Sequence, residues 1–277
     1  MELGIFAKTF TGTRPSVVMA AARIAGYRNV QYNMACSGLE SMPAAIPDDI
    51  ADAVLAGAID HGLAVTAVSA TYNMIHPDPA IRQRGHDSLR VIARASHRMG
   101  TRLLTLCTGT RDPDDQWRAH PGNNRPEAWR DLLASMETAL AIAEEHDVNL
   151  AIEPELANVV NSSAKARLLI DELSSPRLKV VLDPANLFEA VPVHEQRAIV
   201  AESIELLADR IIMAHAKDRN ADGGFVTTGT GVLDYDHYLR CLARVKFDGP
   251  LVTHGLAARE AADVARFLGA KLAELPA

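Results

Sequence analysis

Short runs of apolar residues alternate along the chain with longer segments in which Ala, Leu and charged residues recur at helical spacing. Apolar runs of about four to eight residues are typical of buried strands, and longer amphipathic segments are typical of helices that cover them. This alternation predicts βαβ units and therefore a parallel sheet. The eight predicted strands are Leu3–Lys8, Asn29–Tyr32, Leu63–Ser69, Arg102–Cys107, Val148–Glu153, Leu178–Asp183, Arg210–His215 and Pro250–His254.

Eight strand–helix units within 277 residues predict an α/β protein that folds as a (β/α)₈ TIM barrel, which needs about 250 residues. No low-complexity linker divides the sequence, so we expect one barrel domain over residues 1–277. An open doubly wound sheet is the alternative, but no Gly-x-Gly-x-x-Gly motif follows the first predicted strand. The predicted helices are 14–26, 46–61, 79–99, 126–146, 162–173, 194–209, 235–245 and 257–273.

Composition narrows the partners that the protein can have. Hydrophobic residues make up 48% of the chain, and the net charge of −7 disfavours binding to phosphate backbones, so we expect no nucleic-acid partner. No run reaches the roughly eighteen apolar residues of a membrane span, and the first residues carry no basic leader, so we expect a soluble cytoplasmic protein without a membrane partner. Cys36, Cys107 and Cys241 are far apart and odd in number, which is typical of reduced thiols.

Polar residues end the last four predicted strands, namely Glu153, Asp183, His215 and His254. Catalytic residues of such barrels lie at the carboxyl ends of strands, so we expect these four to meet around a divalent metal. Carboxylate and imidazole ligands suit Mn²⁺, Mg²⁺, Co²⁺ or Zn²⁺. A single polar strand end has a simpler explanation, contact with water, and a lone His such as His254 is often only a hydrogen-bonded structural residue. Strand alternation places Lys217 on the same side as His215, facing the mouth.

These residues belong to a longer series of motifs, and in this order and spacing the sequence resembles the xylose isomerase-like TIM barrels of the sugar phosphate isomerase/epimerase superfamily. That group includes ketose epimerases, hydroxypyruvate isomerases, inosose dehydratases and apurinic endonucleases. The resemblance covers nearly the whole chain and implies a small carbohydrate-like substrate and often a homo-oligomer. The motifs are Tyr72–Asp78, Glu153–Glu155, Asp183 with Asn186, His215–Asp218, Gly229–Tyr235 and Phe247–Leu251.

The resemblance also implies a ligand set. The family's mononuclear site uses a Glu, an Asp, a His and a second Glu from the last four strands, and the first three correspond to Glu153, Asp183 and His215. His254 stands where the family has the second Glu. Both Glu residues move protons in ketose epimerases, so this departure puts epimerisation by two carboxylates in doubt. Asn186 stands where the family often has a His that contacts substrate.

The predicted reaction is isomerisation or epimerisation next to the carbonyl of a sugar, a cyclitol or a small hydroxy-keto compound. A base removes a proton from carbon, and a metal stabilises the resulting enediolate. The resemblance implies that Glu153 is the base, and we expect His254 or Lys217 to return the proton, with the pKa of the Lys lowered by a neighbouring cation. The same enolate could lose a β-hydroxyl group, so a dehydratase acting on a keto-sugar or inosose is the main alternative.

Other polar residues follow the predicted strands as candidate substrate contacts, each with the alternative of an ordinary loop residue. His76 is also a candidate ligand of a second metal. Arg111 and Trp117 lie in a long polar loop after the fourth strand, which is typical of a lid that grips an anionic group and stacks on a sugar. Lys8 is predicted on the same side of its strand as Gly4 and Phe6. The remaining candidate substrate contacts are Asn73, Glu155 and Asn186.

Two other classes of function stay open. An apurinic endonuclease-like metallohydrolase needs more His ligands and a positive groove, which the acidic net charge opposes. A sugar-binding barrel without chemistry is suggested by His254 in place of the family's Glu. The metal content of the purified protein and its turnover of abasic DNA would distinguish these classes.

Overall fold

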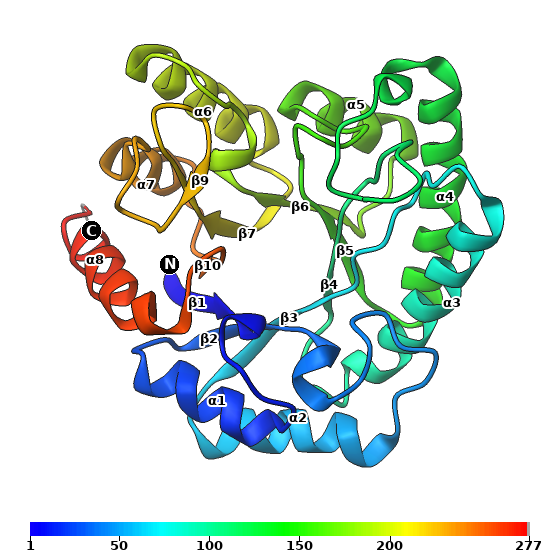
Figure 1. Ribbon diagram of the computed structural model, residues 1–277, viewed down its shortest axis with the longest axis horizontal. Helices are drawn as coiled ribbons and strands as arrows, with labels where there is room; N and C mark the ends of the chain where they lie inside the picture. The colour runs from blue at the N-terminus through cyan, green and yellow to red at the C-terminus, as the bar shows by residue number, and fades with distance from the viewer. Residues whose placement is uncertain (276–277) are drawn as a thin grey trace.

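Eight parallel strands close into a barrel in the computed structural model, which describes residues 1–275. The strand order around the barrel is β1-β10-β7-β6-β5-β4-β3-β2, and the helices form a ring outside it (Figure 1). The predicted single-domain (β/α)₈ barrel is therefore confirmed. Its strands are β1 (Glu2–Phe6), β2 (Asn29–Tyr32), β3 (Ala64–Ser69), β4 (Leu103–Leu106), β5 (Asn149–Ile152), β6 (Leu178–Leu182), β7 (Ile211–Ala216) and β10 (Pro250–Thr253).

Eight α-helices lie between these strands among residues 1–275, in the predicted order. Three of them begin at a side-chain cap, since Asp78, Ser162 and Asp234 accept hydrogen bonds from the backbone of the helices that follow them. None of the helices in this range is both long and apolar enough to cross a bilayer. The helices are α1 (Pro15–Ile24), α2 (Asp48–Asp60), α3 (Pro79–Ser96), α4 (Pro126–Glu145), α5 (Ser163–Leu173), α6 (Val193–Leu207), α7 (Tyr235–Arg244) and α8 (Ala261–Ala273).

A short antiparallel hairpin follows β7 and was not predicted. It pairs β8 (Asp218–Arg219) with β9 (Phe225–Val226). Strands of two residues carry too little apolar pattern to be found in a sequence. Residues 1–275 also include five short 3₁₀ helices, η1 (Ala7–Thr9), η2 (Met34–Ser37), η3 (Pro121–Asn124), η4 (Pro184–Asn186) and η5 (Ala258–Glu260).

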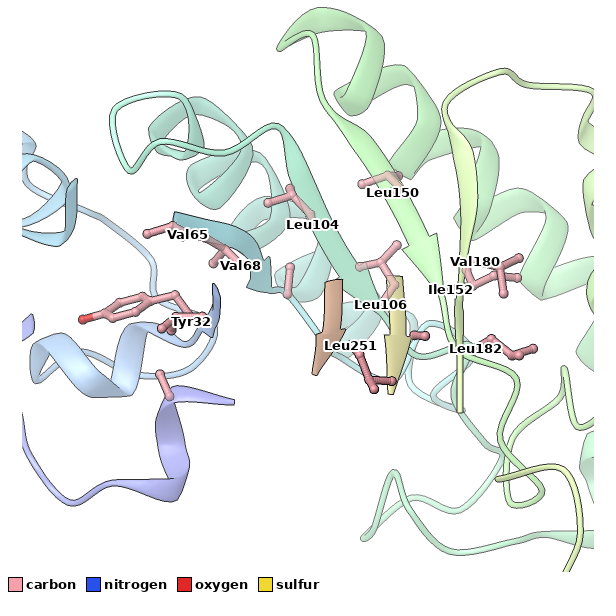
Figure 2. Packing of buried hydrophobic residues seen from close by; sticks show 14 of the residues in the cluster. Tyr32, Val65, Val68, Leu104, Leu106, Leu150, Ile152, Val180, Leu182 and Leu251 are labelled. Carbon is pink, nitrogen blue, oxygen red and sulfur yellow. The ribbon is translucent and has the colours of Figure 1, made fainter. Parts of the chain in front are cut away.

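The strands carry two different apolar layers because successive side chains point to opposite faces. Outward side chains such as Leu104, Leu106 and Ile152 pack against the helices in the main core (Figure 2). Inward side chains form a second, smaller layer that fills the barrel. Its buried members are Ala67, Leu103, Ala151, Val181, Met213 and Val252.

The strand ends differ from the prediction by one or two residues, and the differences affect the mouth. β1 ends at Phe6, so Lys8 does not continue the alternation of the strand and instead lies exposed in η1. Glu153, Asp183 and His254 are each the first residue beyond their strands. These three strands therefore end directly before a residue of the predicted site.

Candidate active site

The four side chains predicted to meet do lie together at the carboxyl end of the barrel. One possible ligand atom from each of Glu153, Asp183, His215 and His254 lies within 4.8 Å of all the others. Each of these residues stands two positions after a member of the inner apolar layer, and side chains two apart share a face of the strand. The site is thus the next layer above the apolar filling of the barrel. The apolar residues beneath it are Ala151, Val181, Met213 and Val252.

Asp183 is fixed by its own turn. Its Oδ1 accepts a hydrogen bond of 2.9 Å from the backbone N–H of Ala185 at the start of η4. Its Oδ2 is buried and accepts no hydrogen bond of ordinary geometry, although Lys217 Nζ lies 2.9 Å away. Burial opposes the charge of this carboxylate, but Lys217 and the nearby imidazoles hold its pKa well below the usual range. Asp183 is therefore an ionised group with one oxygen directed into the site.

Glu153 is also held as a carboxylate. Its Oε1 accepts a hydrogen bond of 2.8 Å from Asn186 Nδ2 and lies 3.1 Å from His215 Nδ1. Burial again works against ionisation, yet His215 and Lys217 outweigh it and the pKa of Glu153 is lowered. Asn186, predicted to contact substrate, here bridges Glu153 to Lys217, whose Nζ donates to Asn186 Oδ1 at 2.9 Å.

Lys217 is buried among acids. Desolvation alone would lower its pKa, but Asp183, Glu153 and Glu155 raise it above the ordinary value. Three carboxylates near the ammonium group cause this shift, and the lowering expected from a neighbouring cation stays a prediction. Its Nζ also lies 4.5 Å from the centre of the Phe225 ring on β9. Lys217 is therefore a protonated group at the edge of the site.

His254 lies against His215 with an edge-to-face ring geometry. The atoms His254 Nε2 and His215 Nδ1 are 3.1 Å apart, and the same Nε2 lies 3.6 Å from Asp183 Oδ2. Desolvation lowers the pKa of His254 to about 4, and Lys217 and then His215 act in the same direction. His254 is therefore a neutral imidazole at neutral pH, which is the form that binds a metal.

Two polar residues inside the barrel escaped the sequence prediction. Gln31 Oε1 on β2 lies 2.9 Å from His215 Nε2, and Gln31 Nε2 donates to Thr105 Oγ1 on β4 at 3.0 Å. All three residues are buried. The available signal was a Gln at an inward position of a predicted strand, which is unusual in a barrel filled by apolar side chains.

The donor atoms of the four clustered residues fit a divalent cation. They comprise two carboxylates and two imidazoles, ligands that Mn²⁺, Co²⁺ and Zn²⁺ accept. The buried Asp183 Oδ2 has no hydrogen-bond donor of ordinary geometry, and Glu153 Oε1 faces the ring nitrogen of His215. Lys217 balances one of the two carboxylate charges, so one negative charge is left to attract a cation.

Asn73 and His76, after β3, are engaged by protein partners. Asn73 Nδ2 donates to the carbonyl of Thr110 at 2.8 Å, and its Oδ1 accepts from the N–H of Thr110 at 3.0 Å. His76 Nδ1 accepts from the N–H of Asp78, and its Nε2 lies 2.9 Å from the carbonyl of Pro113. Both side chains hold the loop after β4, and His76 does not join the cluster of possible ligands. Their contact with substrate stays a prediction.

The loop after β4 is tied down at several points. Arg111 forms an ion pair of 2.7 Å with Asp131 on α4 and donates to the carbonyl of Ile75. Asp112 accepts hydrogen bonds from two N–H groups of its own loop. Trp117 is about half exposed, with an accessible fraction of 52%. These contacts hold the loop to α4 and to the segment after β3, and its predicted role as a lid stays a prediction.

Glu155 lies beside Lys217, next to the cluster. Burial raises its pKa to about 7, although Lys217 acts to lower it. Unlike Glu153 and Asp183, whose pKa values are lowered, Glu155 therefore changes its protonation near neutral pH. Its role as a substrate contact, like that of Lys8 and Trp117, stays a prediction.

Asp218 explains a motif that the sequence left without a role. This buried carboxylate accepts hydrogen bonds from four backbone N–H groups, those of Arg219, Gly229, Gly231 and Leu233. The segment from residue 229 to 233 is thereby held against the end of β7. A Cβ at Gly231 would lie 2.1 Å from the carbonyl oxygen of Arg219, so glycine is needed for this approach.

Residues 19–271 match the family described as xylose isomerase-like TIM barrel. No curated protein matches the sequence of the chain. The match covers most of the chain and includes every residue of the cluster described above.

Solved structures with the same fold include three enzymes of low sequence identity. The 3-keto-D-glucoside 4-epimerase of E. coli superposes with a TM-score of 0.78 at 15% identity, covering 98% of this chain and 99% of that chain. The D-allulose 3-epimerase of Methylomonas sp. in complex with D-allulose gives 0.73 at 17% identity, covering 98% and 97%. The probable 3-DHS dehydratase of Bacillus anthracis gives 0.76 at 13% identity, covering 97% and 99%. At these identities the likeness concerns the fold.

Proposed function

Because the chain belongs to the xylose isomerase-like TIM barrel family, we propose that it is a metal-dependent isomerase or epimerase of a sugar, a cyclitol or a small hydroxy-keto compound. The observation that carries this proposal is the convergence of Glu153, Asp183, His215 and His254 within 4.8 Å at the mouth of the barrel. These four residues would hold a divalent cation. When bound, the cation would supply a positive charge that stabilises an enediolate.

The chain's own residues divide the proton transfers. Glu153 is an ionised carboxylate held by Asn186 and His215, so it is the base that removes the proton next to the carbonyl. Lys217 is protonated and lies 2.9 Å from Asp183, so it is the group that returns the proton. His254, predicted as a ligand or an acid, is better suited to the ligand role because its neutral ring has no spare proton to give.

The proposed substrate class rests on the family, on the polar groups at the mouth of the barrel and on the net charge of the protein. The structural neighbours are epimerases of sugars and a dehydratase, and one of them holds D-allulose. Two carboxylates, two imidazoles and an amide at the mouth offer many acceptors and donors for hydroxyl groups. A small polyhydroxylated carbonyl compound fits this chemistry better than a nucleic acid, whose phosphates the net charge of −7 repels.

A dehydratase is the second candidate, and one observation favours it. Glu153 and Lys217, the two groups that could move protons, differ in charge, so the site is not symmetric in the way that epimerisation by two carboxylates requires. A base that removes the proton and an acid that protonates a departing β-hydroxyl group would together expel water. The same residues would then serve a lyase.

The proposal is tested by incubating the protein with ketoses, inososes and hydroxypyruvate in D₂O, with added Mn²⁺, Co²⁺ or Mg²⁺. We expect deuterium in the product at the carbon next to the carbonyl, and chelator should abolish its incorporation. In Glu153→Gln the rate should fall by about 10²–10⁴-fold while the fold is kept, because the amide cannot accept the proton. An unsaturated product identifies the dehydratase.

The exposed Glu145→Gln is the matched control, since Glu145 ends α4, before the start of β5 and thus at the opposite end of that strand from Glu153, and is not among the possible ligands. It should leave deuterium incorporation unchanged. Near-normal turnover in Glu153→Gln would remove Glu153 from the role of base. Failure of the wild type to bind stoichiometric metal would contradict the proposal as a whole.

A further inference from the structure

His215 has two ring nitrogens in different surroundings. Nδ1 faces the cluster, 3.1 Å from Glu153 Oε1 and 3.1 Å from His254 Nε2. Nε2 faces the opposite way, into the barrel, 2.9 Å from Gln31 Oε1. Both oxygens can only accept, so each favours a proton on the nitrogen that it faces. Nδ1 presents a lone pair to a cation only when the single proton of the neutral ring lies on Nε2, next to Gln31.

Gln31 is itself held in one orientation. Its Nε2 donates to Thr105 Oγ1 at 3.0 Å, which leaves its Oε1 directed at His215. A carbonyl oxygen can only accept, so His215 Nε2 must carry the proton in this arrangement. Gln31, Thr105 and His215 are all more than nine-tenths buried, with accessible fractions of 6%, 3% and 2%, so water competes little for these bonds.

The backbone also adjusts at Gln31. The pairing of β2 with β3 shifts register between Val30 and Gln31. Irregularities of this kind re-aim a side chain and occur often next to active sites. Here the shift coincides with the one residue of β2 that reaches His215 on the far side of the barrel.

We infer that Gln31, oriented by Thr105, is a positioning residue that fixes His215 in the tautomer with its proton on Nε2 and its Nδ1 lone pair directed at the cation. The inference rests on the proposed metal site and names the part of the chain that prepares one of its ligands. Outer partners of this kind set the orientation and the basicity of a ligating imidazole. Gln31 touches no substrate and acts only through His215.

The test compares isosteric and conservative variants by two readouts that need no turnover. Gln31→Met keeps the volume and removes the acceptor, whereas Gln31→Glu keeps an acceptor for the Nε2 proton. Titration calorimetry with Mn²⁺ alone should show an affinity about 10–100-fold weaker in Gln31→Met, and an affinity close to wild type in Gln31→Glu. The matched control is Asn29→Leu, two positions earlier on β2 and buried, whose side chain donates to Glu2 and not to His215.

The second readout is the ¹⁵N spectrum of histidine-labelled, metal-free protein, which reports the nitrogen that carries the proton. We expect Nε2 of His215 to carry a proton in the wild type and in Gln31→Glu. In Gln31→Met the proton should lie on Nδ1, where Glu153 Oε1 accepts it. A wild type whose Nε2 carries no proton, or a Gln31→Met variant with unchanged Mn²⁺ affinity, overturns the inference. If Gln31→Met does not fold, the wild-type spectrum alone still tests whether Nε2 of His215 carries a proton. A wild type that binds no Mn²⁺ would instead contradict the proposed function. The spectrum of the metal-free protein would still test the protonation of His215 Nε2 by itself.

Discussion

At residue 254 an imidazole takes a position where the resemblance implies a carboxylate, and the exchange changes the charge of the site. Glu153 and Asp183 are ionised and Lys217 is protonated, so these three side chains together carry one negative charge. A second Glu would have doubled it. The neutral ring of His254 still supplies a lone pair, so the chain keeps a fourth donor but attracts a divalent cation less strongly.

Removal of the His254 ring should weaken metal binding. In His254→Ala we expect the Mn²⁺ affinity to fall by at least about tenfold, the lower end of the loss seen even for outer partners of a metal ligand. In His254→Glu the affinity should exceed that of the wild type, because the added carboxylate brings a full negative charge close to the cation. Titration calorimetry with Mn²⁺ measures both.

His194→Ala is the control for these variants, since His194 lies exposed at the start of α6 and carries the same ring. Its Mn²⁺ affinity should equal that of the wild type. Equal affinities in His254→Ala and the wild type would leave His254 as a substrate contact or a packing residue beside Phe6, whose ring it meets edge-on.

Among the elements, the segment between β9 and α7 depends on a single carboxylate. Asp218 receives four backbone N–H groups, three of them from residues 229–233. In Asp218→Asn one oxygen becomes an NH₂ group that faces N–H donors. We expect the loss of about 2–3 kcal/mol of stability, the scale of hydrogen bonds to a charged group, and faster hydrogen exchange at the amides of Gly229 and Gly231.

Asp222→Asn serves as the comparison, because Asp222 is exposed on the loop between β8 and β9 and its side chain accepts none of these bonds. Its exchange rates and its free energy of unfolding should match those of the wild type. Equal protection of Gly229 and Gly231 in Asp218→Asn would mean that the segment is held by packing instead of by the carboxylate.

The strands and helices of the barrel were predictable because apolar residues recur along each of them at a regular spacing. All eight barrel strands and all eight helices were expected in the observed order, with ends that differ by a few residues. Local polar contacts determine where each strand or helix ends, and the spacing of apolar residues does not reveal these contacts. The chain turns into η1 after Phe6, where the N–H of Phe10 bonds to the carbonyl of Ala7, and Lys8 therefore lies outside β1.

The site was predictable only in part, for a related reason. The side chains that end the strands converge because barrel closure brings the carboxyl ends of all strands to one face, so Glu153 and Asp183 could be grouped from the sequence. Partners that lie across the barrel could not be grouped in this way. Gln31 and His215 are 184 positions apart, and their contact depends on the register of strands on opposite sides. The same limit hid the binding of Asn73 to the loop after β4.

For the molecule as a whole, two groups at the mouth make the free energy of unfolding depend on pH in opposite directions. His254 has a pKa of about 4 in the fold and about 6.5 when unfolded. Its contribution is complete above pH 6.5 and is lost as the pH falls towards 4, because the unfolded chain binds the proton first. Glu155 has a pKa raised to about 7 from 4.5, so its contribution is complete below pH 4.5 and is lost as the pH rises through 7.

Between pH 7 and pH 5 these two contributions change by similar amounts, about 2 kcal/mol each with opposite sign. Together they should therefore change the free energy of unfolding of the metal-free wild type very little over this range.

Variants at the two positions separate the two contributions. From pH 7 to pH 5, His254→Gln should gain about 2 kcal/mol relative to the wild type, and Glu155→Gln should lose about as much. Urea unfolding of chelator-treated protein at both pH values measures the differences. Both variants keep Lys217, His215, Asp183 and Glu153, the other charged and titratable groups that affect the pKa of His254. Parallel pH curves for wild type and His254→Gln would mean that His254 titrates normally in the fold, and that its ring is open to water instead of enclosed with Glu153, Asp183 and His215.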